Sequence, residues 1–376
     1  MNVTRIVTPI VIVVVALLAA AGLVSAIGVS PADAAVAFWT GTFGTPVNFG
    51  VTLTQAVPLF LVALGWIVST KAGRLHVGFP GQIITGGTFA TTVGLMCTDL
   101  PSFVALPLTV IAGIVGGALW AAVTAWLWAV RGVLEIVSSL LLNLVAVEIA
   151  TWLIRGPLRG SVDGQPQSAT FPSSTLWPSV PGIPGGALSF DVLLMPICAV
   201  LLVLVFSRTR FGFDLRASGG NETAAHWSGM NPKRIGVLAI LVSGGFAGLA
   251  GAALLFAGSA PWMSDGFEAG VGFNGIAVAL LARNSPIGAI LAAVVFSALN
   301  VGSTALQAKL DVPSSLAAVL QGAVIVLVLL SVVVLTIRSR RGAGTPGAGT
   351  PGAGTPVAGS PVTATIEPVR EPVGKV

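Results

Sequence analysis

The chain contains about ten long apolar runs separated by short polar segments, and this pattern constrains its fold more than any other feature. A helix needs about 20 apolar residues to cross the hydrocarbon core of a bilayer. The 376 residues are 55% hydrophobic and only 8% charged, whereas soluble domains are roughly a quarter charged. The sequence therefore predicts an all-α fold, a polytopic bundle of transmembrane helices with about ten spans.

Continuous apolarity gives approximate positions for these spans. They are Ile6 to Ile27, Val51 to Ser69, Gln82 to Met96, Phe103 to Val130, Val133 to Ile154, Val192 to Phe206, Ile235 to Ala257, Val271 to Ala282, Ile287 to Leu306 and Ser315 to Ile337. The third and eighth spans are short and begin near Pro80-Gly81 and Gly270. We expect these two to be tilted, broken or partly re-entrant, because irregular backbone is tolerated where protein or a water-filled cavity covers it.

The basic residues predict the orientation, because Lys and Arg are enriched in cytoplasmic loops. With ten crossings, thirteen basic residues fall on one side and three on the other. The thirteen are Arg5, Lys71, Arg74, Arg131, Arg208, Arg210, Arg216, Lys233, Arg234, Arg283, Arg338, Arg340 and Arg341; the three are Arg155, Arg159 and Lys309. Both termini are therefore expected in the cytoplasm. The N-terminal run also resembles a signal peptide with a cleavage site near Ala32-Asp33-Ala34, but its length favours a retained span.

Charge and cysteine content disfavour two other kinds of site. The formal net charge of +5 comes from residues in separate short loops, which disfavours nucleic-acid binding. Cys97 and Cys198 lie far apart without metal-ligand spacing, and we expect both to be packing residues. The single Gly-Lys pair, Gly374-Lys375, is followed by Val376 and so makes no P-loop. If ATP drives this protein, a separate subunit must bind it.

Glycines one helical turn apart occur in two of the expected spans. Gly113 and Gly117 lie in the fourth span, and Gly244 and Gly248 lie in the seventh. Small residues at this spacing let helix backbones approach closely inside a membrane. We therefore expect tight helix packing at these positions.

Three polar stretches interrupt the apolar pattern. Residues 342–356 repeat Gly-Ala-Gly-Thr-Pro three times, and such a composition cannot bury a core. We therefore expect residues 1–341 to form the transmembrane domain and residues 342–376 a disordered cytoplasmic tail. An external segment, residues 155–191, is long and rich in Pro, Ser and Gly, which favours a docking role. The third stretch is the cytoplasmic loop of residues 207–234.

This cytoplasmic loop carries its own helix signals. Asn221 can cap a short helix over residues 223–228, Gly229 suits a left-handed stop, and Pro232 is expected to prevent the helix from resuming. A short helix of small residues with a projecting Trp227 suits a groove on a soluble partner. The alternative is an ordinary solvated connector.

Four blocks of the chain carry specific patterns. They are Leu75 to Gln82, similar to F-N-I-G-x-E-G-Q; Glu135 to Asn143, similar to E-V-I-S-T-x-M-L-N and followed by Arg155-Gly156-Pro157-Leu158; Arg208 to Gly212, reading R-T-R-F-G; and Gly272 to Leu281, similar to G-F-x-G-I-A-V-A-L-L. Together they resemble the permeases of bacterial ABC importers in the branched-chain amino acid, ribose and nucleoside group. The resemblance is strongest to the nucleoside, or basic-membrane-protein-dependent, branch. His76 and Pro80 depart from the usual Asn and Glu of the first block.

The resemblance implies a permease in the bacterial plasma membrane that works with a cytosolic ABC ATPase, a second paralogous permease and an external solute-binding lipoprotein. ATP and Mg would bind to the ATPase, and no cofactor, metal or catalytic residue is expected in this chain. The Gly81-Gln82 ending of the first block resembles the longer of two paralogous permeases, which favours a heterodimer. The residues expected to couple to the ATPase are Gly212, Gly219, Asn221, Ala224, Ala225, Trp227 and Gly229.

Polar side chains inside the spans are candidates for the substrate path, because they are unfavourable in lipid unless they are paired or face a cavity. The candidates are Gln82, Ser138, Ser139, Asn143, Glu148, Asn274 and Asn300. For each of them, hydrogen bonding between helices is an equal alternative, and Glu148 could equally pair across a subunit interface or lie close to the external boundary. Glu135, near Arg131 at the cytoplasmic end, is expected to be structural.

These features predict inward transport of nucleosides or related small solutes by alternating access. One alternative is a permease for simple sugars such as ribose. Another is an ion-coupled secondary carrier, which needs intramembrane carboxylates or cation sites, and only Glu148 and Glu135 qualify. A membrane enzyme is disfavoured, because no nucleophile, base or metal constellation is evident in the sequence.

Overall fold

The structure is a computed structural model that describes residues 21, 22, 25, 28–160, 166–257, 260–310 and 322. The first expected span, Ile6 to Ile27, lies mostly outside these residues. The tenth span, Ser315 to Ile337, lies almost wholly outside them, and the predicted tail of residues 342–376 lies wholly outside.

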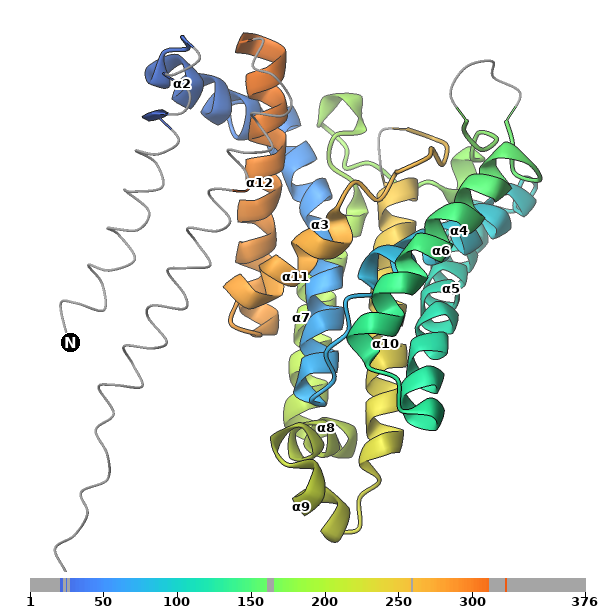
Figure 1. The fold of residues 1–376 in the computed structure, drawn as a ribbon. Helices are drawn as coiled ribbons and strands as arrows, with labels where there is room; N and C mark the ends of the chain where they lie inside the picture. Colours follow the sequence, from blue (N-terminus) through green and yellow to red (C-terminus); the bar gives the residue numbers. More distant parts are fainter. Residues whose placement is uncertain are drawn as a thin grey trace, which may run out of the picture.

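The described part of the chain is built of helices joined by loops (Figure 1), as expected for an all-α membrane protein. The α-helices are α2 (Pro31–Thr42), α3 (Pro46–Lys71), α4 (Phe79–Met96), α5 (Ser102–Arg131), α6 (Glu135–Arg155), α7 (Leu194–Arg208), α8 (Arg210–Gly220), α9 (Glu222–Trp227), α10 (Pro232–Phe256), α11 (Val271–Leu281) and α12 (Pro286–Leu310). Short 3-10 turns occur at η1 (Ser173–Thr175), η2 (Pro184–Gly186) and η3 (Phe190–Leu193).

Six helical segments in the described residues are long and apolar enough to cross a membrane. They are Pro46–Lys71, Ser102–Arg131, Glu135–Arg155, Phe190–Arg208, Pro232–Phe256 and Pro286–Leu310. The expected third and eighth spans correspond to α4 and α11, which have 18 and 11 residues. At about 1.5 Å of rise per residue, α11 is too short to cross the hydrocarbon core. The chain is therefore a polytopic helical membrane protein in which α11 is shortened as expected, whereas α4 reaches the length of roughly 17 to 25 residues that a span needs.

Helix α3 forms the centre of the core, with α10, α11 and α12 packed around it (Figure 1). Residues 56–69 of α3 are buried without interruption. A helix that is apolar on every side is stable only when other helices surround it. Its start is fixed by Thr45, whose side chain accepts a hydrogen bond from the Asn48 amide at 3.1 Å.

The paired glycines of α5 and α10 pack against one another, as the sequence predicted. A Cβ added at Gly248 would overlap the carbonyl oxygen of Gly113, and one added at Gly117 would overlap that of Gly244. The two helix backbones are therefore in direct contact, which only residues without a side chain allow.

Two helices and one helix start differ from the expectations. The sequence did not single out α2, which packs on α12 with Phe38 against Gly302. It also missed α8, which Thr209 caps by accepting a hydrogen bond from the Gly212 amide at 3.1 Å. The expectation for Pro232 was wrong, because this residue begins α10 directly. Proline is favoured at the first position of a helix, where its missing N–H is not needed.

The two ends of the bundle have different characters (Figure 1). Helices α8 and α9 form one end. The connection from α6 to α7, which contains the described residues 166–193, and the loop between α10 and α11 lie at the opposite end. The candidate site lies between these ends, where α4 begins.

Candidate translocation site and coupling surface

Helices α4 and α11 begin against each other. A Cβ added at Gly272 would lie only 2.6 Å from the backbone nitrogen of Pro80, so no side chain separates their first turns. The carboxylate of Glu268 accepts hydrogen bonds from the amides of Gly272 at 2.5 Å and Gly270 at 3.1 Å. This caps α11 and holds its first turn beside α4.

Helix α6 holds the backbone that leads into α4. Asn143 accepts a hydrogen bond from the Gly81 amide at 2.9 Å and donates one to the Val77 carbonyl at 3.0 Å. Ser139 accepts a hydrogen bond from the Val77 amide at 3.1 Å. Since the connection from α3 to α4 is not helical here, these side chains satisfy backbone groups that would otherwise be buried unpaired.

Gln82 lies in the first turn of α4 and is only 1% exposed. Neither its side-chain oxygen nor its nitrogen has a hydrogen-bond partner among the described residues. The indole nitrogen of Trp120 is likewise buried and unpaired within the described chain, and it lies 2.8 Å from the position of a Cβ on Gly81. A buried polar group without a protein partner is unfavourable unless water or a solute supplies one, so these side chains are available to bind a solute.

The structure brings together some of the predicted path residues and separates others. Gln82, Ser139 and Asn143 gather at the start of α4, and the contact between α4 and α11 brings the first turn of α11, with Asn274, beside them. Ser138 bonds to carbonyls of its own helix. The other two predicted residues lie elsewhere, Glu148 on the exposed face of α6 and Asn300 partly buried on α12.

Both departures from the family pattern in the Leu75–Gln82 block have structural partners. Pro80 packs directly against the backbone of Gly272 in α11. His76 is fully buried, its Nε2 lies 3.1 Å from the Ser243 hydroxyl of α10, and its ring stacks on Phe79 with a centroid distance of 4.8 Å. The segment that enters α4 is therefore held by neutral contacts to α6, α10 and α11.

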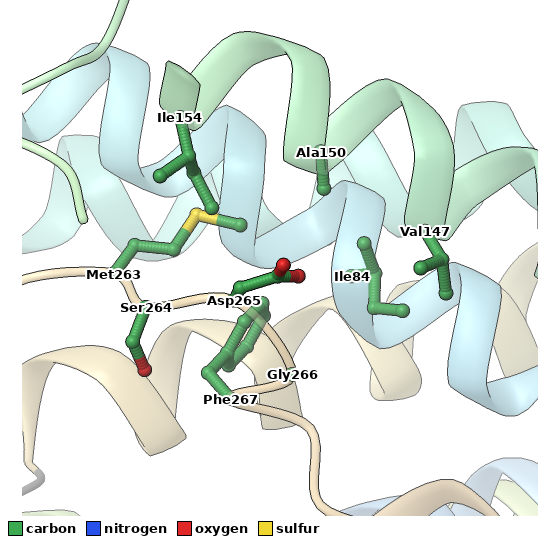
Figure 2. Close-up of a pocket in the computed structure, with 9 residues that line it drawn as sticks. All are labelled: Ile84, Val147, Ala150, Ile154, Met263, Ser264, Asp265, Gly266 and Phe267. Carbon is green, nitrogen blue, oxygen red and sulfur yellow. The ribbon is translucent and has the colours of Figure 1, made fainter. Parts of the chain in front are cut away.

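A small, partly open pocket lies between α4, α6 and residues 263–267 (Figure 2). Its walls are mainly apolar, with the carboxylate of Asp265 at one side. That carboxylate accepts a hydrogen bond from Thr151 at 3.0 Å and lies 3.9 Å from an Arg155 guanidinium nitrogen. The predicted path residues are not among those that line this pocket. It gave no signal in the sequence, because Asp265 and Thr151 are more than a hundred residues apart.

The helix signals of the loop 207–234 are confirmed in their main features. Asn221 accepts a hydrogen bond from the Ala224 amide at 3.0 Å and so caps α9. Gly229 has the left-handed φ of 83° that ends the turn. Trp227 projects from the helix and is 84% exposed.

The predicted coupling residues fall into groups with different surroundings. Gly212 packs against the backbone of Val205 in α7, and Gly219 packs against the backbone of Lys71 at the end of α3. Ala225 is buried, whereas Ala224 is exposed beside Trp227. The glycines therefore let α8 pack closely on the bundle, and Ala224 and Trp227 are part of the exposed surface of α9.

Comparison with known proteins identifies the family. Residues 48–329 match the family described as the permease component of branched-chain amino acid transport systems. The glucose ABC transporter permease protein TsgB13 of Haloferax volcanii is 36% identical, over 86% of this chain and 87% of that protein. The nucleoside permease protein NupB of Lactococcus lactis is 30% identical, over 80% of this chain and 84% of that protein. The guanosine permease protein NupP of Bacillus subtilis is also 30% identical, over 83% and 89%.

A second permease from each of these three organisms matches less closely, at 26% to 30% identity. The matches confirm the resemblance seen in the four sequence blocks and favour it over an ion-coupled carrier or an enzyme. The chain therefore belongs to the family of branched-chain amino acid transport permeases and is a multi-pass permease subunit of an ABC importer in the nucleoside and sugar branch.

Proposed function

We propose that this chain carries nucleosides into the cell as one of two different permease subunits, with ATP hydrolysis on a separate ATPase. The observation that carries the substrate class is the neutral polar group at the start of α4. Gln82, with both side-chain polar atoms unpaired in the described structure, lies beside the hydrogen bonds of Asn143 and Ser139. Amides and hydroxyls suit the ribose hydroxyls and base edges of a nucleoside.

Among the described residues, no charged side chain at this group is fully buried, which also supports a neutral solute. Among the described residues that are buried, Asp191 is the one carboxylate, and it lies at the start of the segment that leads into α7. An amino acid would bring a carboxylate and an ammonium group, and buried charges require partners of opposite sign. We therefore favour nucleosides over branched-chain amino acids.

Glucose is the second candidate, because the glucose permease of Haloferax volcanii shares 36% identity with this chain. Sugars offer the same hydroxyl chemistry as ribose but lack an aromatic base. The two solutes are thus distinguished by the base. The partly buried indole of Trp120 beside Gly81 offers an aromatic ring for this base, together with an N–H that has no partner in the described chain.

We infer from α9 that an ATPase supplies the energy for transport and that this end of the bundle faces the cytoplasm. Its exposed Ala224 and Trp227 offer a small convex surface for a groove on a cytosolic ATPase. The excess of Lys and Arg on this side of the chain supports a cytoplasmic position for α9. On the opposite side, the 155–191 segment is proposed to dock a solute-binding lipoprotein.

A second, paralogous permease is supported by two observations. Each of the three organisms has two permeases that match this chain. One of the two has the higher identity and matches over a longer stretch. In addition, Leu141, Leu144, Glu148 and Trp152 form one exposed stripe along α6. A carboxylate on such a stripe is unfavourable in lipid, so we propose that the second permease covers it.

The test is uptake by the complex reconstituted in vesicles with its second permease, ATPase and binding protein. We expect ATP-dependent accumulation of radiolabelled adenosine, guanosine or uridine, with unlabelled glucose a poor competitor. Glucose uptake that nucleosides do not inhibit would instead assign the chain to sugar transport. Uptake that continues without ATP would reject the proposed drive.

A further inference from the structure

We propose that Arg74 is a positioning residue that transmits movement of α9 to the start of α4. This inference rests on the proposed function, because it takes α9 as the helix that the ATPase moves. Arg74 lies in the connection between α3 and α4, and the sequence pattern gave it no role beyond its contribution to orientation. In the structure its side chain is only 14% exposed and contacts several helices.

The guanidinium of Arg74 binds two carboxylates from distant parts of the chain. One nitrogen lies 2.7 Å from a carboxylate oxygen of Glu222, the first residue of α9. The other lies 3.1 Å from a carboxylate oxygen of Glu135, the first residue of α6. Since each carboxylate uses a different nitrogen, both bonds form at once and the planar fork of arginine joins α9 to α6.

Two further helices fix the plane of this guanidinium. Its central carbon lies 4.3 Å from the ring centroid of Trp128 in α5. A Cβ on Gly236 of α10 would lie 2.8 Å from the Trp128 ring and 3.3 Å from the Arg74 side chain. The glycine therefore leaves just enough space for the stacked pair. Lysine could not replace arginine here, because it lacks both the stacking plane and the fork.

A second contact ties the same turn of backbone to α8. A Cβ on Gly219 would lie 2.9 Å from the amide nitrogen of Gly73, the residue before Arg74. Helices α8 and α9 are separated only by Asn221, which caps α9. Helix α8 therefore packs on the backbone of Gly73, while α9 binds the side chain of Arg74. A displacement of α9 is transmitted directly to this turn.

The turn leads within a few residues to the candidate site. Val77 is held by Ser139 and Asn143, Gly81 is held by Asn143, and Gln82 follows in the first turn of α4. Glu135 begins the helix that carries Ser139 and Asn143. Arg74 is thus connected both to the backbone that leads into α4 and, through Glu135, to α6. A movement of Arg74 therefore changes the position of this backbone relative to α6.

The two carboxylates differ in exposure, and this difference indicates which of the two ion pairs of Arg74 breaks more easily. The side chain of Glu222 is 50% exposed, whereas that of Glu135 is 14% exposed. Water can replace the outer bond more easily than the inner one. We infer that the Arg74–Glu222 bond breaks and re-forms during the transport cycle, while Arg74 and Glu135 stay together.

The experiment measures solute transported per ATP hydrolysed in the reconstituted complex, together with co-purification of the ATPase. Glu222→Gln is expected to leave ATPase binding and unstimulated hydrolysis unchanged, and to lower the transport ratio by about tenfold, within the usual range of coupling between sites. Arg74→Gln should give a similar loss. The double variant should be no worse than Arg74→Gln, because both changes remove the same connection.

Matched controls are Asp214→Asn on α8 and Arg131→Gln at the end of α5, neither of which makes an ion pair in the described structure. Normal transport per ATP in Glu222→Gln, or defects that multiply in the double variant, would overturn the proposal. If Arg74→Gln does not assemble, Glu222→Gln alone decides.

The proposal that α9 contacts the ATPase is tested separately by Ala224→Arg on the exposed face of α9. Loss of ATPase co-purification in that variant, together with normal coupling in Glu222→Gln, rejects only the role of Arg74. Normal co-purification in Ala224→Arg rejects α9 as the ATPase-contacting helix, and the Arg74 proposal falls with it.

Discussion

Gly272 and Pro80 meet with their backbones in contact, since a Cβ on Gly272 would lie 2.6 Å from the Pro80 nitrogen and 2.7 Å from its ring. This contact joins the first turns of α11 and α4, the two helices in the expected broken or re-entrant spans. Helix N-termini carry partial positive charge. At α11 this charge is offset, because the carboxylate of Glu268 accepts hydrogen bonds from the amides of Gly270 and Gly272.

Gly272→Ala should therefore weaken the fold. The new methyl group would overlap backbone and ring atoms of Pro80 that cannot rotate away, and overpacking of this kind lowers the free energy of unfolding by about 1 to 3 kcal/mol. The measurement is the melting temperature of the detergent-solubilised complex. Gly220→Ala is the control, because its added Cβ would have no atom within 4 Å apart from its own stretch of backbone. Equal melting temperatures for both variants would contradict the contact.

Asn143→Ala tests whether α6 holds the entry to α4. The substitution removes the acceptor of the Gly81 amide and the donor to the Val77 carbonyl, and each unpaired buried group costs about 1 to 3 kcal/mol. We expect a lower melting temperature together with reduced uptake. Asn300→Ala, on α12, serves as the comparison and should melt near the wild-type temperature. Reduced uptake at an unchanged melting temperature would instead favour direct contact between Asn143 and the solute.

Gln82→Leu should reduce uptake without reducing stability. Because neither polar atom of Gln82 has a partner in the described chain, its replacement by an apolar side chain removes a penalty of about 1 to 3 kcal/mol. The melting temperature should stay the same or rise, while uptake falls. Gln55→Leu, at an exposed position of α3, should leave uptake unchanged. Full uptake by Gln82→Leu would remove Gln82 from the proposed path.

The sequence was informative where a single helix decides the outcome. The expected span from Val271 to Ala282 ends within one residue of α11, and the cap by Asn221 and the stop at Gly229 are where local patterns placed them. These features depend on neighbours within a few residues, which the sequence contains directly.

Contacts between distant segments could not be read in this way. Arg74 and Glu222 are 148 residues apart, and His76 and Ser243 are 167 apart. Polarity identified Ser139 and Asn143 as special, but it could not show that their partners are backbone groups of residues 77 and 81. Helix α8 escaped notice because two glycines at its end suggest a loop, although the Thr209 cap was a usable signal.

Trp227→Cys tests the orientation that the basic residues predict. In a variant without Cys97 and Cys198, we expect a membrane-impermeant maleimide to label this exposed position only in inside-out vesicles. Ser173→Cys, exposed in the connection from α6 to α7, should be labelled only in intact cells. The reverse pattern would place α9 outside the cell and would reject the proposed contact with the ATPase.

The stripe on α6 makes the final prediction, which concerns the second permease. Leu141, Leu144, Glu148 and Trp152 follow one another at three- and four-residue intervals and so share one face. Apolar neighbours alone could face lipid, but a carboxylate among them requires a hydrogen-bond donor or a cation. A photoreactive amino acid at Leu144 should therefore form a crosslink to the second permease in membranes.

Leu201 of α7, which is 53% exposed, is the matched position for a lipid-facing residue and should give no such crosslink. Glu148→Leu should also weaken co-purification of the second permease, because it removes the carboxylate. If Leu144 crosslinks no more than Leu201 and Glu148→Leu assembles normally, another face of the bundle joins the two subunits, and the carboxylate must then be explained by water reaching α6 from the adjoining pocket beside Val147.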